Sequence, residues 1–138
     1  MVRELVILET LDSPNVIKVH EFIKTTNNFY MVQEYANGGS LQRLLDSRGR
    51  FTEAISKKIL KQIIKGMTAL YDIKVAHRDL KLDNILVSFP NQGETITDEQ
   101  LKRIDLENEE FVVKIADLGY SRAIDDDERA KTGCGTPL

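Results

Sequence analysis

The sequence has one cysteine, two histidines, no excess of basic residues and no long apolar run. An internal disulfide needs two thiols, so Cys134 cannot form one. His20 and His77 are too few and too far apart for an evident zinc site. Nineteen Lys and Arg against 22 Asp and Glu give a formal net charge of -3, which provides no overall positive field to attract phosphate backbones. We therefore expect no nucleic-acid partner, and no membrane span because no run approaches the length that one needs.

The residues that are present are those of an ordinary folded protein. Of 138 residues, 41% are apolar and 30% are charged, which excludes disorder and collagen-like repeats. Arg3 and Glu4 interrupt the stretch where a signal peptide would need continuous apolar residues, so we expect a cytoplasmic or nuclear location. One domain is the expectation at this length.

Apolar spacing predicts a helix, a hairpin and a connector in the first 39 residues. The helix is indicated by Val2, Leu5, Val6, Leu8 and Leu11, at spacings of three and four, and should end before Pro14. It has no N-cap, so we expect the chain to begin inside a domain. Residues 16–24 and 29–35 are rich in β-branched and aromatic side chains and predict a hairpin. Residues 36–39 then form a flexible connector.

Two further helices are expected between residues 41 and 71. A short helix begins near Leu41 and ends at Gly49, and a long helix begins at the N-cap Thr52 and ends near Tyr71. The long helix carries an apolar stripe that should be buried. Its members are Ile55, Ile59, Leu60, Ile63, Ile64, Met67 and Leu70.

The second half of the chain predicts a strand pair with an insertion. Residues 85–89 and 111–116 could pair, but the 21 residues between them exceed a usual hairpin loop. That insertion has its own local structure or is disordered, and we favour a short helix because Thr97 and Gln100 have capping-box spacing. Residues 120–138 are expected to form a mobile loop.

Three short patterns point to no separate site. The second zinc ligand of an HExxH motif is missing after His20, which makes His20 a plain strand residue. Asp105, Glu107 and Glu109 alternate like calcium ligands but lack the glycine and the closing glutamate of that loop. Gly133 and Gly135 precede no helix, so they do not suggest a phosphate cradle.

One motif is different. The string HRDLKLDN at residues 77–84 is followed by an apolar strand and then by Asp117, Leu118 and Gly119. With these two motifs in this order, the chain resembles the eukaryotic protein kinases. Phosphoryl transfer needs a base near the acceptor hydroxyl, a cation on the moving phosphate and oxygen ligands for magnesium. The residue types of the two motifs supply all three.

The resemblance implies ATP and Mg²⁺ as cofactors and a protein with Ser or Thr acceptors as substrate. Asp79 corresponds to the base that accepts the hydroxyl proton, and Lys81 to the lysine that neutralises the γ-phosphate and suggests Ser/Thr specificity. Asn84 and Asp117 match the two magnesium ligands. Leu118 replaces the usual phenylalanine, a departure that keeps an apolar side chain.

The resemblance extends in both directions along the chain. Upstream, Glu4 aligns with the helix glutamate that pairs with the ATP-positioning lysine, although that lysine and the Gly-rich loop are absent from the sequence. The implied adenine site consists of Gln33 guarding a rear pocket, backbone groups of Glu34 and Ala36, and Leu86 under the base. Downstream, the implied regulatory residues are Arg78, which could bind a phosphate on Thr132, and Thr136 near the catalytic pair.

We therefore expect an α+β, protein-kinase-like fold in partial form. The implied parts are a small-lobe remnant at 1–35, a hinge at 36–39 and a large-lobe part at 40–138, with the insertion at about 90–110 and the activation segment at 117–138. The insertion and the GTPL ending are similar to the autophagy-initiating serine/threonine kinases. The expected function is a serine/threonine protein kinase, inactive as these 138 residues alone. A non-catalytic module that binds partners and an acidic scaffold built on the insertion remain alternatives.

Overall fold

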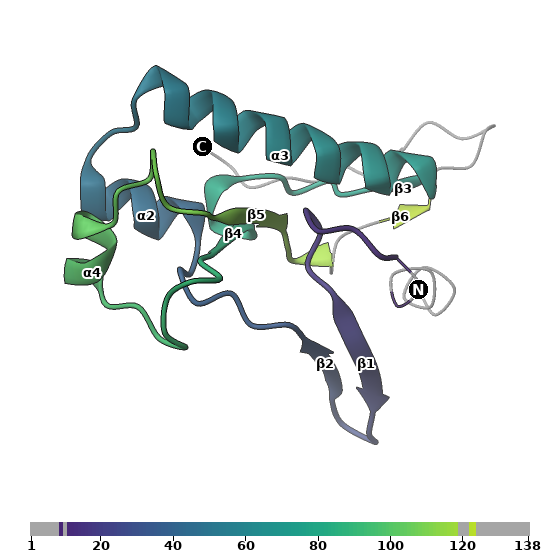
Figure 1. Ribbon diagram of the computed structural model, residues 1–138. Helices are drawn as coiled ribbons and strands as arrows, with labels where there is room; N and C mark the ends of the chain where they lie inside the picture. Colours follow the sequence, from purple (N-terminus) through teal and green to yellow (C-terminus); the bar gives the residue numbers. More distant parts are fainter. Residues whose placement is uncertain (1–8, 10, 119–121, 124–138) are drawn as a thin grey trace.

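The computed structural model describes residue 9, residues 11–118 and residues 122–123. Within them, a β-hairpin projects from a body made of helices and short strand pairs (Figure 1). Of the helix predicted at the start of the chain, residues 1–8 and 10 lie outside the described residues and Glu9 is helical. Leu11, Asp12 and Ser13 are not helical, so the helix ends earlier than predicted. Among the described residues, no helix has the length and apolar character to cross a bilayer.

The hairpin consists of β1 (Val19–Lys24) and β2 (Phe29–Gln33), which pair antiparallel and confirm the prediction. Its turn is closed by Thr25, whose N–H donates to the Asn28 carbonyl at 2.9 Å. β1 begins later than predicted because Val16 instead forms a parallel bridge to Ile115.

Both predicted helices are confirmed, including the residues that begin and end them. Helix α2 (Leu41–Arg48) has Ser40 as its N-cap and ends at Gly49, whose φ of 77° suits a residue without a Cβ. Helix α3 (Glu53–Asp72) begins after Thr52, whose hydroxyl accepts a hydrogen bond from the Ile55 N–H at 3.3 Å.

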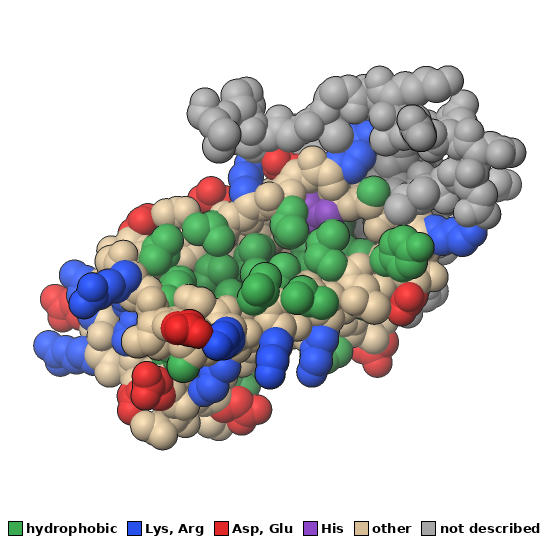
Figure 2. Space-filling view, turned by 90° about the horizontal axis from the view of Figure 1, so that it is seen from above, with side chains coloured by type: hydrophobic (Ala, Val, Ile, Leu, Met, Phe, Trp, Pro, Cys, Tyr) green, Lys and Arg blue, Asp and Glu red, His purple; other side chains and the backbone are tan. Residues whose placement is uncertain are grey.

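The apolar stripe of α3 is only partly buried, which corrects the expectation for two of its residues. Ile55, Ile59 and Leu70 lie in the core, whereas Leu60 and Ile64 are 56% and 55% exposed. Leu60 directly follows the buried Ile59 and Ile64 directly follows the half-buried Ile63. Successive residues are about 100° apart around a helix, so Leu60 and Ile64 lie to the side of the core-facing positions. Figure 2 shows apolar side chains gathered on this upper face of the molecule.

Strand β4 (Ile85–Ser88) pairs antiparallel with β5 (Val112–Ile115), with Ile85 opposite Ile115. The insertion between them is folded. It contains α4 (Asp98–Arg103), begun by the predicted capping box of Thr97 and Gln100. The core shared by α2, α3 and β4 also includes apolar side chains of the insertion, namely Ile96, Leu101, Ile104 and Leu106.

Three short elements escaped the sequence analysis. They are β3 (Val75–Ala76), the 3-10 turn η1 (Leu82–Asn84) and β6 (Arg122–Ala123), with β3 and β6 paired antiparallel. Elements of two or three residues are too short to show a helical or strand period.

Gly66 allows α3 to approach the loop before β1. A Cβ on Gly66 would overlap the backbone carbonyl oxygen of Asn15 and lie 2.9 Å from Cδ1 of Ile115. Asn15 itself is 4% exposed, and its Nδ2 donates to the Val113 carbonyl at 2.9 Å. The close packing of α3 against this loop therefore requires glycine at position 66.

We expect Gly66→Ala to destabilise the protein. Alanine favours a helix over glycine by about 1 kcal/mol, but overpacking a filled site costs about 1–3 kcal/mol, so the net effect should be a loss. Lys65→Ala, at an exposed position of the same turn, is the matched control. Urea denaturation followed by circular dichroism measures both, and a Gly66→Ala variant as stable as the control would contradict the packing argument.

Candidate active site

The HRD loop connects β3 to β4, and His77 fixes its position. The ring is 2% exposed, and its Nδ1 lies 3.2 Å from the Asp79 backbone nitrogen. A backbone N–H can only donate, so Nδ1 accepts and the ring carries its proton on Nε2. Nε2 then donates to the Ala116 carbonyl oxygen at 2.8 Å. One buried side chain therefore joins the loop to the residue before Asp117.

Backbone conformation also marks this region. Arg78 has a φ of 69° and Asp117 a φ of 57°, values in the left-handed region that residues other than glycine seldom adopt. Such conformations persist where surrounding contacts impose them, and they cluster at functional sites. Both residues belong to the two motifs that carry the kinase resemblance.

The side chains of Asp79, Lys81 and Asn84 converge on one carboxylate oxygen. Oδ2 of Asp79 lies 3.1 Å from Nζ of Lys81 and accepts from Nδ2 of Asn84 at 3.0 Å. Nδ2 also donates to the Asp79 backbone carbonyl at 2.9 Å. The Asp79 side chain is 10% exposed, so these contacts are poorly screened by water. The structure thus brings these three predicted site residues together, and their catalytic roles stay a prediction.

Asn84 and Asp117 are brought to the same end of the β4–β5 pair. The Ala116 N–H donates to the Asn84 carbonyl at 2.8 Å, which extends the ladder by one step and places Asp117 directly beyond it. Asp117 is exposed and, within the described part of the chain, its carboxylate has no hydrogen-bond or ion-pair partner. Since Nδ2 of Asn84 is occupied, its Oδ1 is the atom left for a ligand. Two hard oxygen ligands fit Mg²⁺, which takes few protein ligands and completes its shell with phosphate oxygens and water.

The described residues offer no second candidate metal site. The described residues contain no group of three or more His, Cys, Asp or Glu side chains arranged to hold an ion. The carboxylate of Asp105 accepts from Nδ2 of Asn108 and from the Glu107 N–H, and these hydrogen bonds hold the pKa of Asp105 below its ordinary value. The Asp105 carboxylate therefore closes a local turn.

The predicted adenine-binding segment follows β2. The Glu34 side chain points back to the body, where Oε1 lies 3.0 Å from Nζ of Lys114 and accepts from the Lys18 N–H at 2.7 Å. The Glu34 N–H is also used, donating to the Lys18 carbonyl at 2.9 Å. By contrast, the Glu34 carbonyl and the Ala36 N–H have no hydrogen-bond partner among the described residues. One acceptor and one donor are thus left for a ligand with a complementary edge.

Residues 38–40 run beside β4 and bring Leu86 close to the hinge. The Gly38 N–H donates to the Val87 carbonyl at 2.9 Å, and the Val87 N–H donates to the Gly39 carbonyl at 2.8 Å. Ser40 forms an antiparallel bridge with Leu86, which is half-buried.

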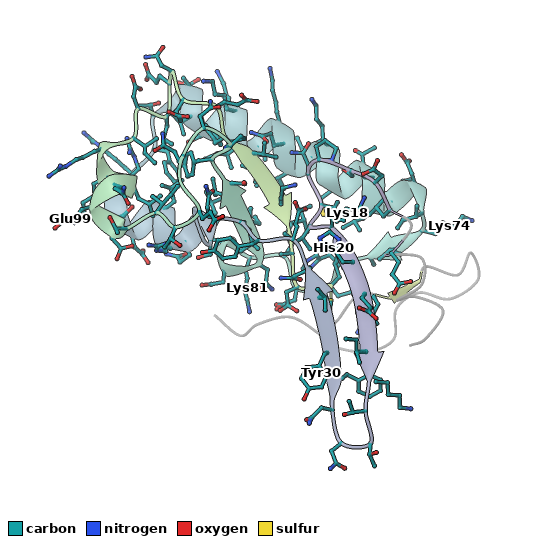
Figure 3. All side chains as sticks on the ribbon, turned by 60° about the horizontal axis from the view of Figure 1, so that its bottom comes forward. Lys18, His20, Tyr30, Lys74, Lys81 and Glu99 are labelled. Atoms are coloured by element: carbon teal, nitrogen blue, oxygen red, sulfur yellow. The ribbon has the colours of Figure 1, made fainter. Side chains whose placement is uncertain are left out.

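The remaining predicted site residues are less defined. Gln33 ends β2 and is exposed, and Arg78 is half-buried beside Asp79. Glu4, Thr132 and Thr136 lie outside the described residues. Figure 3 shows Lys81 on the face of the body from which the hairpin carrying Tyr30 projects.

Sequence analysis missed three residues that support the site. His77 was given no role of its own, and neither Lys114 nor Asn37 was singled out. Lys114 gave a weak signal, since it is the one charged residue in the apolar run 111–116. Asn37 in a glycine-rich connector gave none beyond its preference for turns.

Comparison with known proteins gives one family. The family model described as the protein kinase domain matches residues 1–138. The chain is 35% identical over 138 residues to the probable serine/threonine-protein kinase fhkD of Dictyostelium discoideum, and 32% identical over 138 residues to the serine/threonine-protein kinase ATG1a of Arabidopsis thaliana. Over 137 residues it is 34% identical to the serine/threonine-protein kinase plk-2 of Caenorhabditis elegans.

These matches cover almost all of the chain but only part of each relative. They include 100%, 100% and 99% of the chain, and 16%, 19% and 18% of the respective relatives. ATG1a bears out a likeness to the autophagy-initiating kinases, but the other two relatives are similar to the chain at comparable identity. The particular subfamily therefore stays a prediction.

Proposed function

Because this chain belongs to the protein kinase family and has the α+β fold of a kinase-domain fragment, we propose that the protein containing it transfers the γ-phosphoryl group of ATP to serine and threonine hydroxyls of proteins. The observation that carries the proposal is the convergence of Lys81 and Asn84 on the Asp79 carboxylate. The serine/threonine preference rests on Lys81 and on the names of the relatives.

In this proposal Asp79 orients the acceptor hydroxyl and accepts its proton. The contacts with Lys81 and Asn84 hold the carboxylate in place. Lys81, at 3.1 Å from that carboxylate, is close enough to balance negative charge on the group being transferred. Since the transition state spreads charge over the phosphoryl oxygens, positioning and electrostatics supply most of the rate enhancement.

The same proposal assigns the nucleotide to the space between the hinge and the β4–β5 pair. Asn84 and Asp117 would hold Mg²⁺, and the Glu34 carbonyl and Ala36 N–H would pair with the adenine edge above Leu86. The bound Mg·ATP supplies the phosphoryl group and a cation that neutralises it. We also propose a cytoplasmic or nuclear location, and activation by phosphorylation of Thr132 with Arg78 as the phosphate ligand.

A second candidate function is a non-catalytic module that binds protein partners. It is favoured by the apolar side chains that the described part of the chain leaves exposed on the hairpin and on α3. They include Phe29 at 62%, Tyr30 at 52%, Leu60 at 56% and Ile64 at 55% exposure.

Phosphate transfer from radiolabelled ATP to a generic Ser/Thr peptide separates the two candidates. We expect the full-length gene product to transfer phosphate in a Mg²⁺-dependent way, and a protein of these 138 residues alone to transfer none. The 138 residues contain no Gly-rich loop and no ATP-positioning lysine, so the triphosphate would not be fixed for in-line transfer. A tyrosine peptide is the specificity control. A full-length product that neither binds Mg·ATP nor modifies either peptide would favour the binding module.

A further inference from the structure

We propose that Asn37 is a positioning residue for the nucleotide, because its side chain fixes the hinge at a set distance from β4. This inference rests on the proposed function, which places adenine against the backbone of Glu34 and Ala36. Asn37 directly follows Ala36, and its side-chain amide bonds to Phe89 and Gly93. It acts through the backbone that it holds.

The Asn37 amide uses both of its protons and its oxygen in long-range contacts. Oδ1 accepts from the Phe89 N–H at 2.8 Å. Nδ2 donates to the Phe89 carbonyl at 3.0 Å and to the Gly93 carbonyl at 2.9 Å. These bonds span more than 50 positions of the sequence and connect the hinge to the end of β4 and to the insertion. A side chain that only capped a local turn would not make them.

The partner of Asn37 lies in the hydrophobic core. Phe89 is fully buried, belongs to the main core and packs against Phe111 with ring centroids 6.2 Å apart. A Cβ on the neighbouring Gly38 would lie 2.7 Å from both Cε2 of Phe89 and the Val87 carbonyl oxygen. The backbone of the hinge therefore lies in close contact with β4 at Gly38. A residue with a side chain at this position would not fit, which favours the observed pairing of the hinge with β4.

Asn37 secures the part of this contact that is nearest to the proposed adenine site. The rungs at Gly38 and Gly39 hold the connector farther along the chain, but Ala36 makes only one described backbone contact, from the Gly39 N–H to its carbonyl at 3.1 Å. Without the Asn37 amide, the hydrogen bonds between the hinge and β4 would end at Gly38. The terminal bond, from the Gly38 N–H to the Val87 carbonyl, would then open more often. The spacing between the Ala36 N–H and Leu86 on β4 would then vary.

The insertion takes part in the same arrangement. Gly93 belongs to it, and Arg43 of α2 ties it down by donating from Nη2 to the Ile96 carbonyl at 2.9 Å and from Nε to Oδ1 of Asp98 at 2.8 Å. The insertion is thus bound to α2 through Arg43, and its Gly93 carbonyl accepts a hydrogen bond from Asn37 of the hinge. Its proposed contribution is to keep the nucleotide-binding backbone in place.

The test uses the full-length protein with three variants. Asn37→Ala removes all three hydrogen bonds. Asn37→Asp keeps the volume and the bond from the Phe89 N–H but turns a carboxylate toward two carbonyl oxygens. Gln92→Ala is the matched control, because the side chain of this insertion residue donates from Nε2 to Glu109 at 3.2 Å and forms no hydrogen bond with the described hinge residues 36–39. Steady-state kinetics give KM for ATP, KM for the peptide and kcat, calorimetry gives the affinity for Mg·ADP, and hydrogen exchange reports on the Gly38 and Val87 amides.

We expect both Asn37 variants to raise KM for ATP by about tenfold, because each loses hydrogen bonds that hold the hinge backbone against β4. The affinity for Mg·ADP should fall by a similar factor, KM for the peptide should not change, and the Gly38 amide should exchange faster. Gln92→Ala should match the parent in every measurement. The effect on KM for ATP alone distinguishes positioning from general destabilisation.

The outcomes that overturn the inference are distinct from those that overturn the proposed function. Asn37 variants with parental KM for ATP, or with equal rises in the KM values of ATP and peptide, would refute the role of Asn37 alone. A parent protein that binds no nucleotide would refute the proposed function, and the nucleotide role of Asn37 with it. Should Asn37→Ala fail to fold, Asn37→Asp decides by the same criteria, because it retains the volume of the side chain.

Discussion

Asp79→Asn in the full-length protein should lower kcat for peptide phosphorylation by about a thousandfold, in the range that general-base catalysis contributes. Asparagine has nearly the same shape, but its amide cannot take a proton from the acceptor hydroxyl. It also removes the negative charge that Lys81 contacts at 3.1 Å. Because the variant loses this ion pair, part of the fall in kcat comes from a changed environment of Lys81, a second residue of the site.

Nucleotide binding should be nearly unaffected by Asp79→Asn, because the proposed magnesium ligands and hinge contacts lie on other residues. The prediction is therefore a split, with a large fall in kcat and a small change in KM for ATP, which is the signature of an interaction made in the transition state. Single-turnover measurements with saturating ATP isolate the chemical step.

Asp72→Asn is the control for this experiment. Asp72 is an exposed carboxylate at the last position of α3, so this variant makes the same chemical change away from the site and should keep parental turnover. If Asp79→Asn also kept parental turnover, Asp79 would not be the base. A parallel loss of Mg·ADP affinity would point instead to a structural role for this carboxylate.

The elements of the fold that sequence predicts are those fixed by local signals. The hairpin, α2, α3 and α4 follow from apolar periodicity and from caps that act within four residues, such as Thr52 and Thr97. The exposure of Leu60 and Ile64 was not predictable in this way. Apolar spacing identifies a face of a helix, but whether another element covers that face is a tertiary property.

For the candidate site, too, features with a local sequence signal were predictable and features set by long-range contacts were not. The residues of the HRD loop and Asp117 were recognisable because they match two motifs of the protein kinase family in their order along the chain. The hydrogen bond of His77 to Ala116, the ion pair of Glu34 with Lys114 and the amide contacts of Asn37 were not, since each connects residues 39 or more positions apart. A single sequence carries no signal for such pairs, and only the backbone path brings them together.

Asp117 offers the second prediction of large effect, and its backbone conformation decides how it should be tested. At a φ of 57°, alanine would add a backbone cost of about 1–2 kcal/mol. Asparagine tolerates this conformation better, so Asp117→Asn removes the charge and leaves the backbone in place. We expect the affinity for Mg·ADP to fall by at least about tenfold and phosphate transfer to become hard to detect, because a neutral amide oxygen is a poorer ligand for a hard cation.

Adenosine separates the metal role of Asp117 from a general disturbance of the pocket. It has the adenine edge that the Glu34 carbonyl and the Ala36 N–H would pair with, but no phosphates and therefore no bound metal. Its affinity, measured by calorimetry, should be the same for the Asp117→Asn variant and the parent. Raising the Mg²⁺ concentration should recover part of the lost ADP affinity, since weaker metal binding is offset by mass action. Loss of adenosine affinity, or loss of ADP affinity that Mg²⁺ does not change, would mean that Asp117 supports the pocket by another route.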